Sequence, residues 1–324
     1  MADSTDRLRA FALASGLTSN RFETTDAYEG SLQEVYHTLE QLCFDPKNVV
    51  FVISGKECLL MTDSFGSIKG LGLAAEHGFF YKWPTPNKAI NDRSTNWQTI
   101  TEIGDESWKS TAKMVMELYV QRTHGAYVEQ KGNALIWQFR DADPEFGYLQ
   151  SKELEEHLAN IMAGYPVDVI RGGGVADGYI EVRPAGVSKG LFLEHALSTL
   201  ESMEKDAEFV LAIGDDSSDE PMFDRLADIG KNKTYKQLLS PYGVTVGKKP
   251  TLASSFVDDT AAVIELLTSL TKSAARGMGG RSATELVLSS NSGSFINDSP
   301  NGSPSERQNP ITGRPSHCHS FFLF

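Results

Sequence analysis

The stretch Phe209-Val-Leu-Ala-Ile-Gly-Asp-Asp-Ser-Ser-Asp-Glu-Pro-Met-Phe223 decides the fold, because it joins a buried strand to a helix through an acidic loop. Its first five residues are all apolar, a pattern typical of a parallel strand that is covered on both faces. Gly214 ends the strand, and Pro221 lies in the first turn of a helix that is expected to run towards Ala227. This order predicts an open α/β sheet with a ligand crevice at the carboxyl ends of its strands.

Three aspartates fill the loop of this stretch: Asp215, Asp216 and Asp219. Carboxylates that lie close together repel one another unless a cation neutralises them. Mg2+, a hard cation that prefers oxygen ligands, is the simplest partner for such a group. The alternative is a solvated acidic loop in which one aspartate caps the following helix.

Composition limits the classes of partner. The chain has 324 residues, of which 40% are hydrophobic, and a net charge of −13. This charge argues against nucleic acid or an anionic membrane as the main partner. The three cysteines are widely spaced, so we expect neither a disulfide framework nor a zinc site, and a cytoplasmic setting is favoured. The apolar runs are too short to span a bilayer, and we expect no secretory signal.

The first part of the chain alternates predicted strands and helices. One predicted strand ends in Ser54-Gly55-Lys56. A hydroxyl, a flexible glycine and a cation at the carboxyl end of a strand suit an oxyanion ligand, although an ordinary strand-to-helix turn explains this tripeptide equally well. The predicted elements are a strand at Arg7–Leu13, a helix at Ser31–Cys43, and strands at Asn48–Ile53 and Leu71–Ala75.

The pattern changes near residue 105, where short alternating strands and two helices predict an antiparallel α+β unit over residues 106–184. Glu129, Lys131 and Glu181 could face one surface of its sheet, because side chains alternate along a strand. A solvated polar face would show the same alternation. The predicted helices are Ser107–Thr123 and Ser151–Met162, and the strands are Ala126–Glu129, Ala134–Arg140, Val167–Ile170 and Tyr179–Arg183.

The chain then returns to the core. Lys189 lies in the first turn of a helix that is predicted to end near Met203. A cation is misplaced at this positive helix end unless an anion such as phosphate binds there, and a plain surface lysine is the alternative. Beyond the strand Tyr242–Val246 and the helix Asp259–Leu270, Ser, Gly, Asn and Pro predict a disordered tail. We therefore expect a core of residues 1–105 and 185–271, a cap of residues 106–184 and a tail of residues 272–324.

Several motifs, in this order, resemble those of the trehalose-6-phosphate phosphatase family within the haloacid dehalogenase superfamily. The resemblance covers roughly residues 30–270 and includes the phosphatase half of two-domain trehalose-phosphate synthases. It rests on Val52-Ile-Ser-Gly-Lys56, Leu73-Ala-Ala-Glu-His-Gly78, Val128-Glu-Gln-Lys131, Asp141-Ala-Asp-Pro144, Tyr179-Ile-Glu-Val-Arg-Pro-Ala-Gly-Val-Ser-Lys-Gly190 and Gly214-Asp-Asp-Ser-Ser-Asp-Glu220.

The resemblance implies an α/β fold with a Rossmann-like parallel sheet core of the haloacid dehalogenase type and an inserted α+β cap. It implies hydrolysis of trehalose 6-phosphate to trehalose and phosphate with Mg2+, a reaction that needs positioning and charge neutralisation. By the same resemblance, Ser54 and Lys189 would hold the phosphoryl group. The metal set would be Asp215, Asp216 and Asp219, and the sugar-binding set would be Lys56, Glu129, Lys131 and Glu181.

One family motif has no counterpart in this sequence. Family members carry Asp-x-Asp-Gly-Thr upstream of Ser54, and its first aspartate is the nucleophile. This chain has Ala12-Leu-Ala-Ser-Gly-Leu-Thr18 there. Lys56 and Gln138-Phe139 also depart from the common family residues. Two hypotheses follow: an active phosphatase whose aspartate motif is missing only from this sequence, or an inactive protein that binds trehalose 6-phosphate. The second would sense its ligand or partner a trehalose-phosphate synthase or an active phosphatase subunit, and a general sugar phosphatase is a third candidate.

Overall fold

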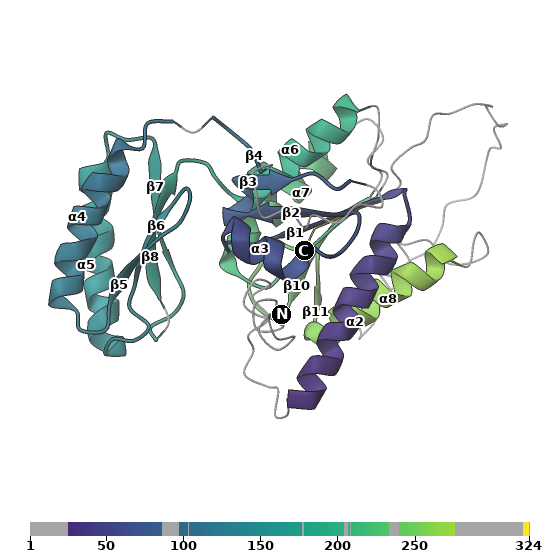
Figure 1. Cartoon of the computed structure of the whole chain (residues 1–324), viewed down its shortest axis with the longest axis horizontal. Helices are drawn as coiled ribbons and strands as arrows, with labels where there is room; N and C mark the ends of the chain where they lie inside the picture. The colour runs from purple at the N-terminus through teal and green to yellow at the C-terminus, as the bar shows by residue number, and fades with distance from the viewer. Residues whose placement is uncertain are drawn as a thin grey trace, which may run out of the picture.

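The computed structural model describes residues 25–85, 97–102, 104–176, 178–203, 207, 209–232, 240–275 and 320–323. The strand predicted at Arg7–Leu13 lies outside these residues. Two sheets organise the described chain, and each belongs to its own layered unit (Figure 1).

The larger sheet has eight strands in the order β11-β10-β9-β12-β1-β2-β3-β4. The strands from β11 to β2 are parallel, whereas β3 and β4 join the edge antiparallel. Strand β1 is largely β-branched, β9 is a run of apolar residues, and both are almost completely buried, as the sequence predicts. The strands are β1 (Asn48–Ile53), β2 (Leu71–Ala75), β3 (Phe80–Lys82), β4 (Gln98–Thr99), β9 (Phe209–Gly214), β10 (Ser240–Val246), β11 (Ser255–Val257) and β12 (Ser320–Leu323).

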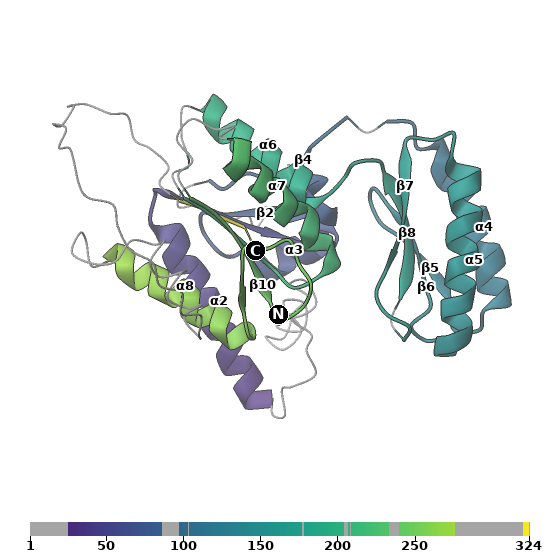
Figure 2. The ribbon, with the colours of Figure 1, turned by 180° about the vertical axis from the view of Figure 1, so that it is seen from behind.

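Helices cover both faces of this sheet, because alternate strand residues point to opposite sides. Val50, Val52 and Leu211 pack with α2 (Thr25–Phe44), α3 (Cys58–Phe65) and α8 (Thr260–Ala275). Phe51 and Val210, on the other face, pack with α6 (Lys189–Ser202) and α7 (Glu220–Asn232). Figures 1 and 2 show the two helix groups on opposite sides of the sheet, which confirms the predicted Rossmann-like core.

The second unit is an antiparallel sheet of four strands in the order β5-β6-β8-β7, with two helices on one face. In Figure 1 its sheet is turned towards the core and its helices lie outside. Its elements are α4 (Ser107–Arg122), β5 (Tyr127–Gln130), β6 (Leu135–Gln138), α5 (Pro144–Met162), β7 (Val167–Gly172) and β8 (Tyr179–Pro184). We call this unit the cap. The predicted α+β architecture is therefore present, while the domain boundaries drawn from the sequence stay a prediction.

The structure departs from the sequence-based expectations at several places, among them the start of α5 and the tail. The helix expected at Ser151 begins earlier, at Pro144, because Asp143 caps it by accepting a hydrogen bond from Phe146 N. The tail was expected to be disordered throughout, but Ser320–Leu323 forms β12 in the middle of the core sheet. Within the described part of the chain, no helix is long and apolar enough to cross a membrane.

Candidate functional site

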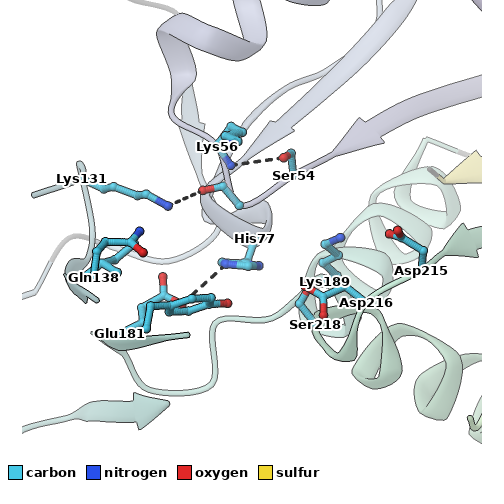
Figure 3. Close-up of a pocket in the computed structure, with 13 residues that line it drawn as sticks. Ser54, Lys56, His77, Lys131, Gln138, Glu181, Lys189, Asp215, Asp216 and Ser218 are labelled. Carbon is cyan, nitrogen blue, oxygen red and sulfur yellow. Dashed lines mark hydrogen bonds and ion pairs between the residues drawn. The ribbon is translucent and has the colours of Figure 1, made fainter. Parts of the chain in front are cut away.

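A cavity of about 260 Å³ lies where the carboxyl ends of β1 and β9 face the cap sheet (Figure 3). Core and cap both contribute to its wall, so one ligand can contact the two units at once. The lining residues are Ser54, Gly55, Lys56, His77, Lys131, Ile136, Gln138, Tyr179, Glu181, Lys189, Asp215, Asp216 and Ser218.

The loop after β1 forms one wall of the cavity and is held by backbone hydrogen bonds to the loop after β2. His77 N donates to Ser54 O at 2.9 Å, and Glu76 N donates to Lys56 O at 3.0 Å. A Cβ at Gly55 would lie 2.8 Å from His77 Nε2, so any other residue here would have to displace the His77 ring. The loop thus presents the Ser54 hydroxyl and the Lys56 ammonium at fixed backbone positions.

Lys189, at the start of α6, pairs with an acid of the loop after β9. Its Nζ lies 2.6 Å from Asp219 Oδ1, and both side chains are almost completely buried. Asp219 Oδ2 also accepts a hydrogen bond from Asp216 N at 2.9 Å. The Asp219 carboxyl lies directly over Gly214, where an added Cβ would clash at 2.2 Å. Asp219 therefore lies beneath the cavity wall, where it orients Lys189.

The surroundings of Asp215 change its protonation. Burial and the neighbouring Asp219 carboxylate raise the pKa of Asp215 to about 6, although Lys249 and Lys189 oppose the shift. Lys249 Nζ also donates to the backbone carbonyl of Asp215. A carboxyl in this position exchanges its proton near neutral pH.

The raised pKa of Asp215 predicts a pH-dependent effect of Asp215→Asn. Because the pKa rises from 3.8 to about 6 on folding, the folded chain binds more protons in between, and stability falls as pH rises through this window. We expect Asp215→Asn to increase the free energy of unfolding by about 1–3 kcal/mol at pH 7.5 and by nothing at pH 3.5. Urea denaturation at both pH values measures this.

The matched control for this prediction is Asp216→Asn, which changes the exposed neighbour and keeps a side chain able to cap η2 (Ser217–Asp219). We expect this control to change stability little at either pH. An equal gain from Asp215→Asn at pH 3.5 and pH 7.5 would contradict the assigned proton exchange.

The three aspartates do not fit a metal ion held by all of them. Both oxygens of Asp219 are engaged, one by Lys189 and one by the backbone of Asp216. Across the described residues, no group of three or more His, Cys, Asp or Glu side chains is arranged to hold a metal ion. The predicted set of Asp215, Asp216 and Asp219 is brought into one loop, but its positive partner in this arrangement is a lysine.

The cap contributes polar side chains from one face of its sheet, on either side of Ile136. Glu129 lies opposite Ile136, and Ile136 lies opposite Glu181, so the three share the face turned to the cavity. Gln138, on the same face, donates from Nε2 to Glu129 Oε2 at 3.1 Å. Lys131 follows β5 and donates from Nζ to Gly55 O of the core at 2.8 Å. Lys131 and Glu181 line the same cavity, and Glu129 contacts the lining residue Gln138.

His77 and Glu181 meet across the boundary between core and cap. His77 Nε2 lies 3.7 Å from Glu181 Oε2, and Arg183 Nη1 lies 3.4 Å from the same oxygen. Burial and then the charges of Arg183, Lys189 and Lys131 lower the pKa of His77 well below its usual range. His77 is therefore neutral, and the ion pair of Glu181 is the one with Arg183.

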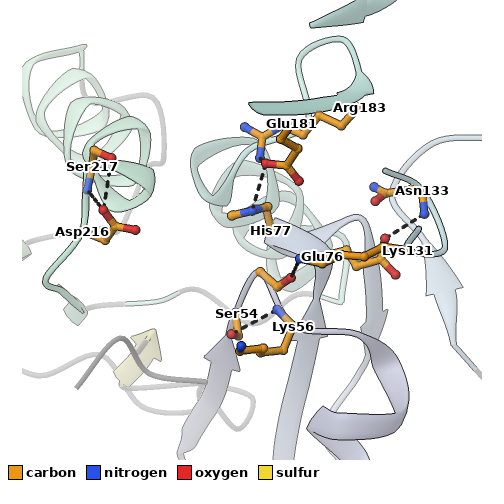
Figure 4. Close-up of polar contacts among 11 residues, drawn as sticks. Ser54, Lys56, Glu76, His77, Lys131, Asn133, Glu181, Arg183, Asp216 and Ser217 are labelled. Carbon is orange, nitrogen blue, oxygen red and sulfur yellow. Dashed lines mark hydrogen bonds and ion pairs between the residues drawn. The ribbon is translucent and has the colours of Figure 1, made fainter. Parts of the chain in front are cut away.

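Glu76 ties the core to the turn between β5 and β6 of the cap (Figure 4). Its carboxylate accepts hydrogen bonds from Gly132 N at 3.0 Å and from Asn133 N at 2.7 Å. Burial is the largest influence and raises the pKa of Glu76, although the two hydrogen bonds oppose the shift. Glu76 and His77 both adopt positive φ angles, of 48° and 59°, which are unusual for residues with a side chain. We call these contacts the Glu76 latch.

The structure brings most of the predicted site residues together. Seven of them line the cavity, namely Ser54, Lys56, Lys131, Glu181, Lys189, Asp215 and Asp216. Asp219 supports Lys189 from below, and Glu129 reaches the cavity through Gln138. Sequence reasoning missed Glu76, Tyr179 and Ser218 and treated His77 as structural. The sequence signal for Glu76 and His77 is the segment Leu73–Gly78, which resembles a motif of the phosphatase family.

Comparisons with known proteins agree on one family. The family model described as trehalose-phosphatase matches residues 18–261. Alpha,alpha-trehalose-phosphate synthase [UDP-forming] 5 of Arabidopsis thaliana is 39% identical over 238 residues, which are 74% of this chain and 26% of the relative. The chain thus spans about a quarter of the length of the curated relatives that it matches.

Solved structures agree with the family model. The C-terminal domain of trehalose-6-phosphate phosphatase from C. albicans has a TM-score of 0.63 and 29% identity, and the match covers 74% of this chain and 84% of that chain. A haloacid dehalogenase-like hydrolase from Bacteroides thetaiotaomicron has a TM-score of 0.53 and 14% identity, covering 80% of this chain and 97% of that chain. The latter likeness concerns the fold alone.

Proposed function

Because the chain belongs to the trehalose-phosphatase family, we propose that the cavity between core and cap binds trehalose 6-phosphate. The proposal rests on one observation: two chemically different groups of side chains line the same cavity. Cations and a hydroxyl come mainly from strand ends of the core, and hydroxyl-binding polar groups come from the cap sheet. A sugar phosphate offers the matching chemistry, an anion at one end and hydroxyls at the other.

In this proposal the phosphate lies against the core. Ser54 donates a hydrogen bond, and Lys56 and Lys189 supply positive charge. Burial and then the charge of Lys131 lower the pKa of Lys56, so an incoming anion stabilises its charged form. Lys189 is already oriented by Asp219, so little side-chain freedom is lost when an anion binds.

The sugar hydroxyls lie against the cap in the same proposal. Glu181 accepts hydrogen bonds while Arg183 holds it in place, and Gln138 and Lys131 can donate. Because Lys131 also bonds to the Gly55 carbonyl, ligand binding and the contact between the two units involve the same side chain. Closure of the cap over the ligand would exclude water from the phosphate.

Hydrolysis of the bound ester to trehalose and phosphate is the second candidate function. The observation that favours it is Asp215, which lines the cavity and whose pKa is raised to about 6, closer to neutral than that of an ordinary aspartate and so better suited to proton transfer. The sequence lacks the family's nucleophilic aspartate motif, so we rank binding first. A protein of either function belongs to trehalose biosynthesis.

We extend the proposal to the cofactor, the partners and the setting of the chain. Since Lys189 occupies Asp219, we expect the ligand to bind equally well with Mg2+ and with EDTA, although the family resemblance implies Mg2+.

A trehalose-phosphate synthase, or an active phosphatase subunit, is the partner that we propose from the relatives' names. Cys43 and Cys58 are free thiols, which suits a reducing compartment such as the cytoplasm.

Lys131→Met tests this placement of the ligand. We expect it to weaken binding of trehalose 6-phosphate about tenfold, the effect of one lost charged hydrogen bond, and to weaken inorganic phosphate binding much less. Isothermal titration calorimetry with both ligands, each in EDTA and in Mg2+, measures the difference. Lys113→Met, on the exposed outer surface of α4, is the matched control.

Three results would overturn parts of the proposal. A wild-type chain that does not bind trehalose 6-phosphate at all would reject it. Equal losses for both ligands in Lys131→Met would reverse the assignment of sugar and phosphate ends. Phosphate release that requires Mg2+ and stops in EDTA would establish the hydrolytic function and show that the aspartates rearrange around the metal.

A further inference from the structure

Tyr179 is an aromatic residue in the cavity wall whose role the proposed function leaves open. It begins β8 and lies level with Gln138 of β6 on one side and with Gly172 of β7 on the other. Glu181, two residues further along β8, shares its face of the sheet. Figure 3 shows Gln138 and Glu181 on the cap side of the cavity. The tyrosine therefore lies among the polar groups that we assign to the sugar.

The ring of Tyr179 lies across the backbone of Gly172 on the neighbouring strand. A Cβ at residue 172 would lie 2.3 Å from Tyr179 Cζ and 2.4 Å from Oη, so any other residue there would have to displace the ring. An aromatic side chain that covers a glycine of the adjacent strand stabilises a sheet by itself. This packing fixes the position of the ring, but it does not by itself indicate a ligand.

The surroundings of the Tyr179 hydroxyl link this residue to the ligand, because they include charges from both units. Burial, and then the charges of Glu181 in the cap and Asp216 in the core, raise the pKa of Tyr179 to about 12. Asp216 follows β9 and lines the same cavity, as does Lys189. Tyr179 thus lies at the junction between the phosphate-binding and the sugar-binding parts of the cavity, and its hydroxyl stays protonated at neutral pH.

A pyranose ring has the chemistry that matches this part of the wall. One of its faces carries C–H groups and is apolar, while its hydroxyl groups project around the edge. An aromatic ring packs against such an apolar face, and polar side chains beside it bind the hydroxyls. Gln138 and Glu181 are the polar neighbours of Tyr179 on the same face of the cap sheet. An open-chain sugar phosphate carries the same phosphate and hydroxyl groups, but it has no apolar ring face.

We propose that Tyr179 is a specificity-determining residue whose ring packs against the pyranose that carries the phosphate. This role rests on the proposed function and adds the class of ligand that the site selects, namely cyclic sugar phosphates in preference to open-chain ones. The sugar ring next to the phosphate is the one that Tyr179 meets, because Asp216 and Lys189 of the phosphate-binding part lie across the cavity from it.

Competition calorimetry on the intact chain tests this specificity. Bound trehalose 6-phosphate is displaced either with glucose 6-phosphate, which is cyclic, or with sorbitol 6-phosphate, its open-chain counterpart. We expect the wild type to bind glucose 6-phosphate about tenfold more tightly than sorbitol 6-phosphate, because only the cyclic ligand packs against the tyrosine ring. Equal affinities for the two competitors would overturn the proposal.

Variants of the pair Tyr179 and Gly172 assign the preference to the ring. Tyr179→Leu should abolish the preference and weaken binding of trehalose 6-phosphate about tenfold, because leucine is apolar but has no flat ring. Tyr179→Phe keeps the ring and should keep the preference. Gly172→Ala should reduce the preference, since the new Cβ displaces the ring.

Two matched controls lie in the cap but outside the cavity. Tyr148→Leu makes the same change on α5, which covers the other face of the cap sheet. Gly164→Ala adds a Cβ where no atom lies within 4 Å of it. We expect both controls to keep the wild-type affinity and the wild-type preference. Urea denaturation of every variant shows whether a loss of binding reflects unfolding, and in that case the phenylalanine variant and the wild-type preference decide.

The possible failures of this experiment are distinguishable. A folded Tyr179→Leu chain with the wild-type affinity and preference would reject the role of Tyr179 and leave the proposed function standing. A Tyr179→Phe chain that loses the preference as fully as the leucine variant would assign recognition to the hydroxyl and overturn the proposed ring contact. A wild type that binds neither trehalose 6-phosphate nor either competitor would reject the proposed function and the role of Tyr179 with it.

Discussion

Lys189→Met is expected to lower the free energy of unfolding by about 3–5 kcal/mol and to remove measurable phosphate binding. The substitution keeps most of the apolar stem of Lys189 and removes its charge. Asp219, with a side chain only 3% exposed, then loses the cation at 2.6 Å and remains as a buried carboxylate without a charge partner. Urea denaturation at pH 7.5 and calorimetric titration with inorganic phosphate measure the two effects.

The double variant Lys189→Met with Asp219→Asn separates the two roles of Lys189. It removes both charges together, so we expect most of the stability to return while phosphate binding stays lost. Arg225→Met, which removes an exposed ion pair with Glu194, is a control that should change stability by less than about 1 kcal/mol. Phosphate binding that returns in the double variant would show that Lys189 does not hold the anion.

Glu76→Ala is expected to open the Glu76 latch. The substitution leaves the backbone N–H groups of Gly132 and Asn133 without their acceptor, and each lost bond to a charged group is worth about 1.5–3 kcal/mol. Water can satisfy these groups only if the turn between β5 and β6 moves away from the core. We therefore expect a larger radius of gyration in small-angle scattering and an affinity for trehalose 6-phosphate reduced at least tenfold.

Two further variants complete the test of the latch. Glu76→Gln keeps one acceptor and turns a donor towards the other amide, so its effect should have the same sign and a smaller size. Glu57→Ala changes an acid of the same core edge whose side chain does not cap α3, and it should leave the scattering profile unchanged. A Glu76→Ala chain with the wild-type radius and the wild-type affinity would show that other contacts hold the cap.

Much of the architecture could be predicted from local sequence pattern. The β-branched run of β1, the apolar run of β9 and the helical periodicity of α4 each depend on residues that are close in sequence. Strand β12 could not be predicted in this way, because Ser-Phe-Phe-Leu is short and gains its structure only from β1 and β9. The start of α5 was missed for a similar reason, since Phe146 and Leu149 are exposed and blur the apolar face.

The positions of some residues in the candidate site follow from the local sequence, whereas the contacts of others depend on distant parts of the chain. Ser54, Lys56 and Asp215 follow apolar strands directly, so their place at the sheet edge follows from the sequence. The ion pair between Asp219 and Lys189 joins residues that are 30 positions apart, and it depends on how α6 packs against α7. The role of Glu76 depends on two consecutive positive φ angles and on a turn of the cap, and neither is encoded in a local pattern.

The division of the cavity wall between two separate sheets has a consequence for inhibitor design. A molecule that contacts only the core, or only the cap, uses part of the cavity wall. It nevertheless loses as much translational and rotational entropy on binding as a molecule that contacts both. A bridging molecule gains from effective concentration, because the first contact presents its other end to the second surface. Free trehalose and free phosphate should therefore each compete poorly, whereas a stable analogue that joins a disaccharide to a non-hydrolysable anion should compete far better than the sum of its fragments suggests.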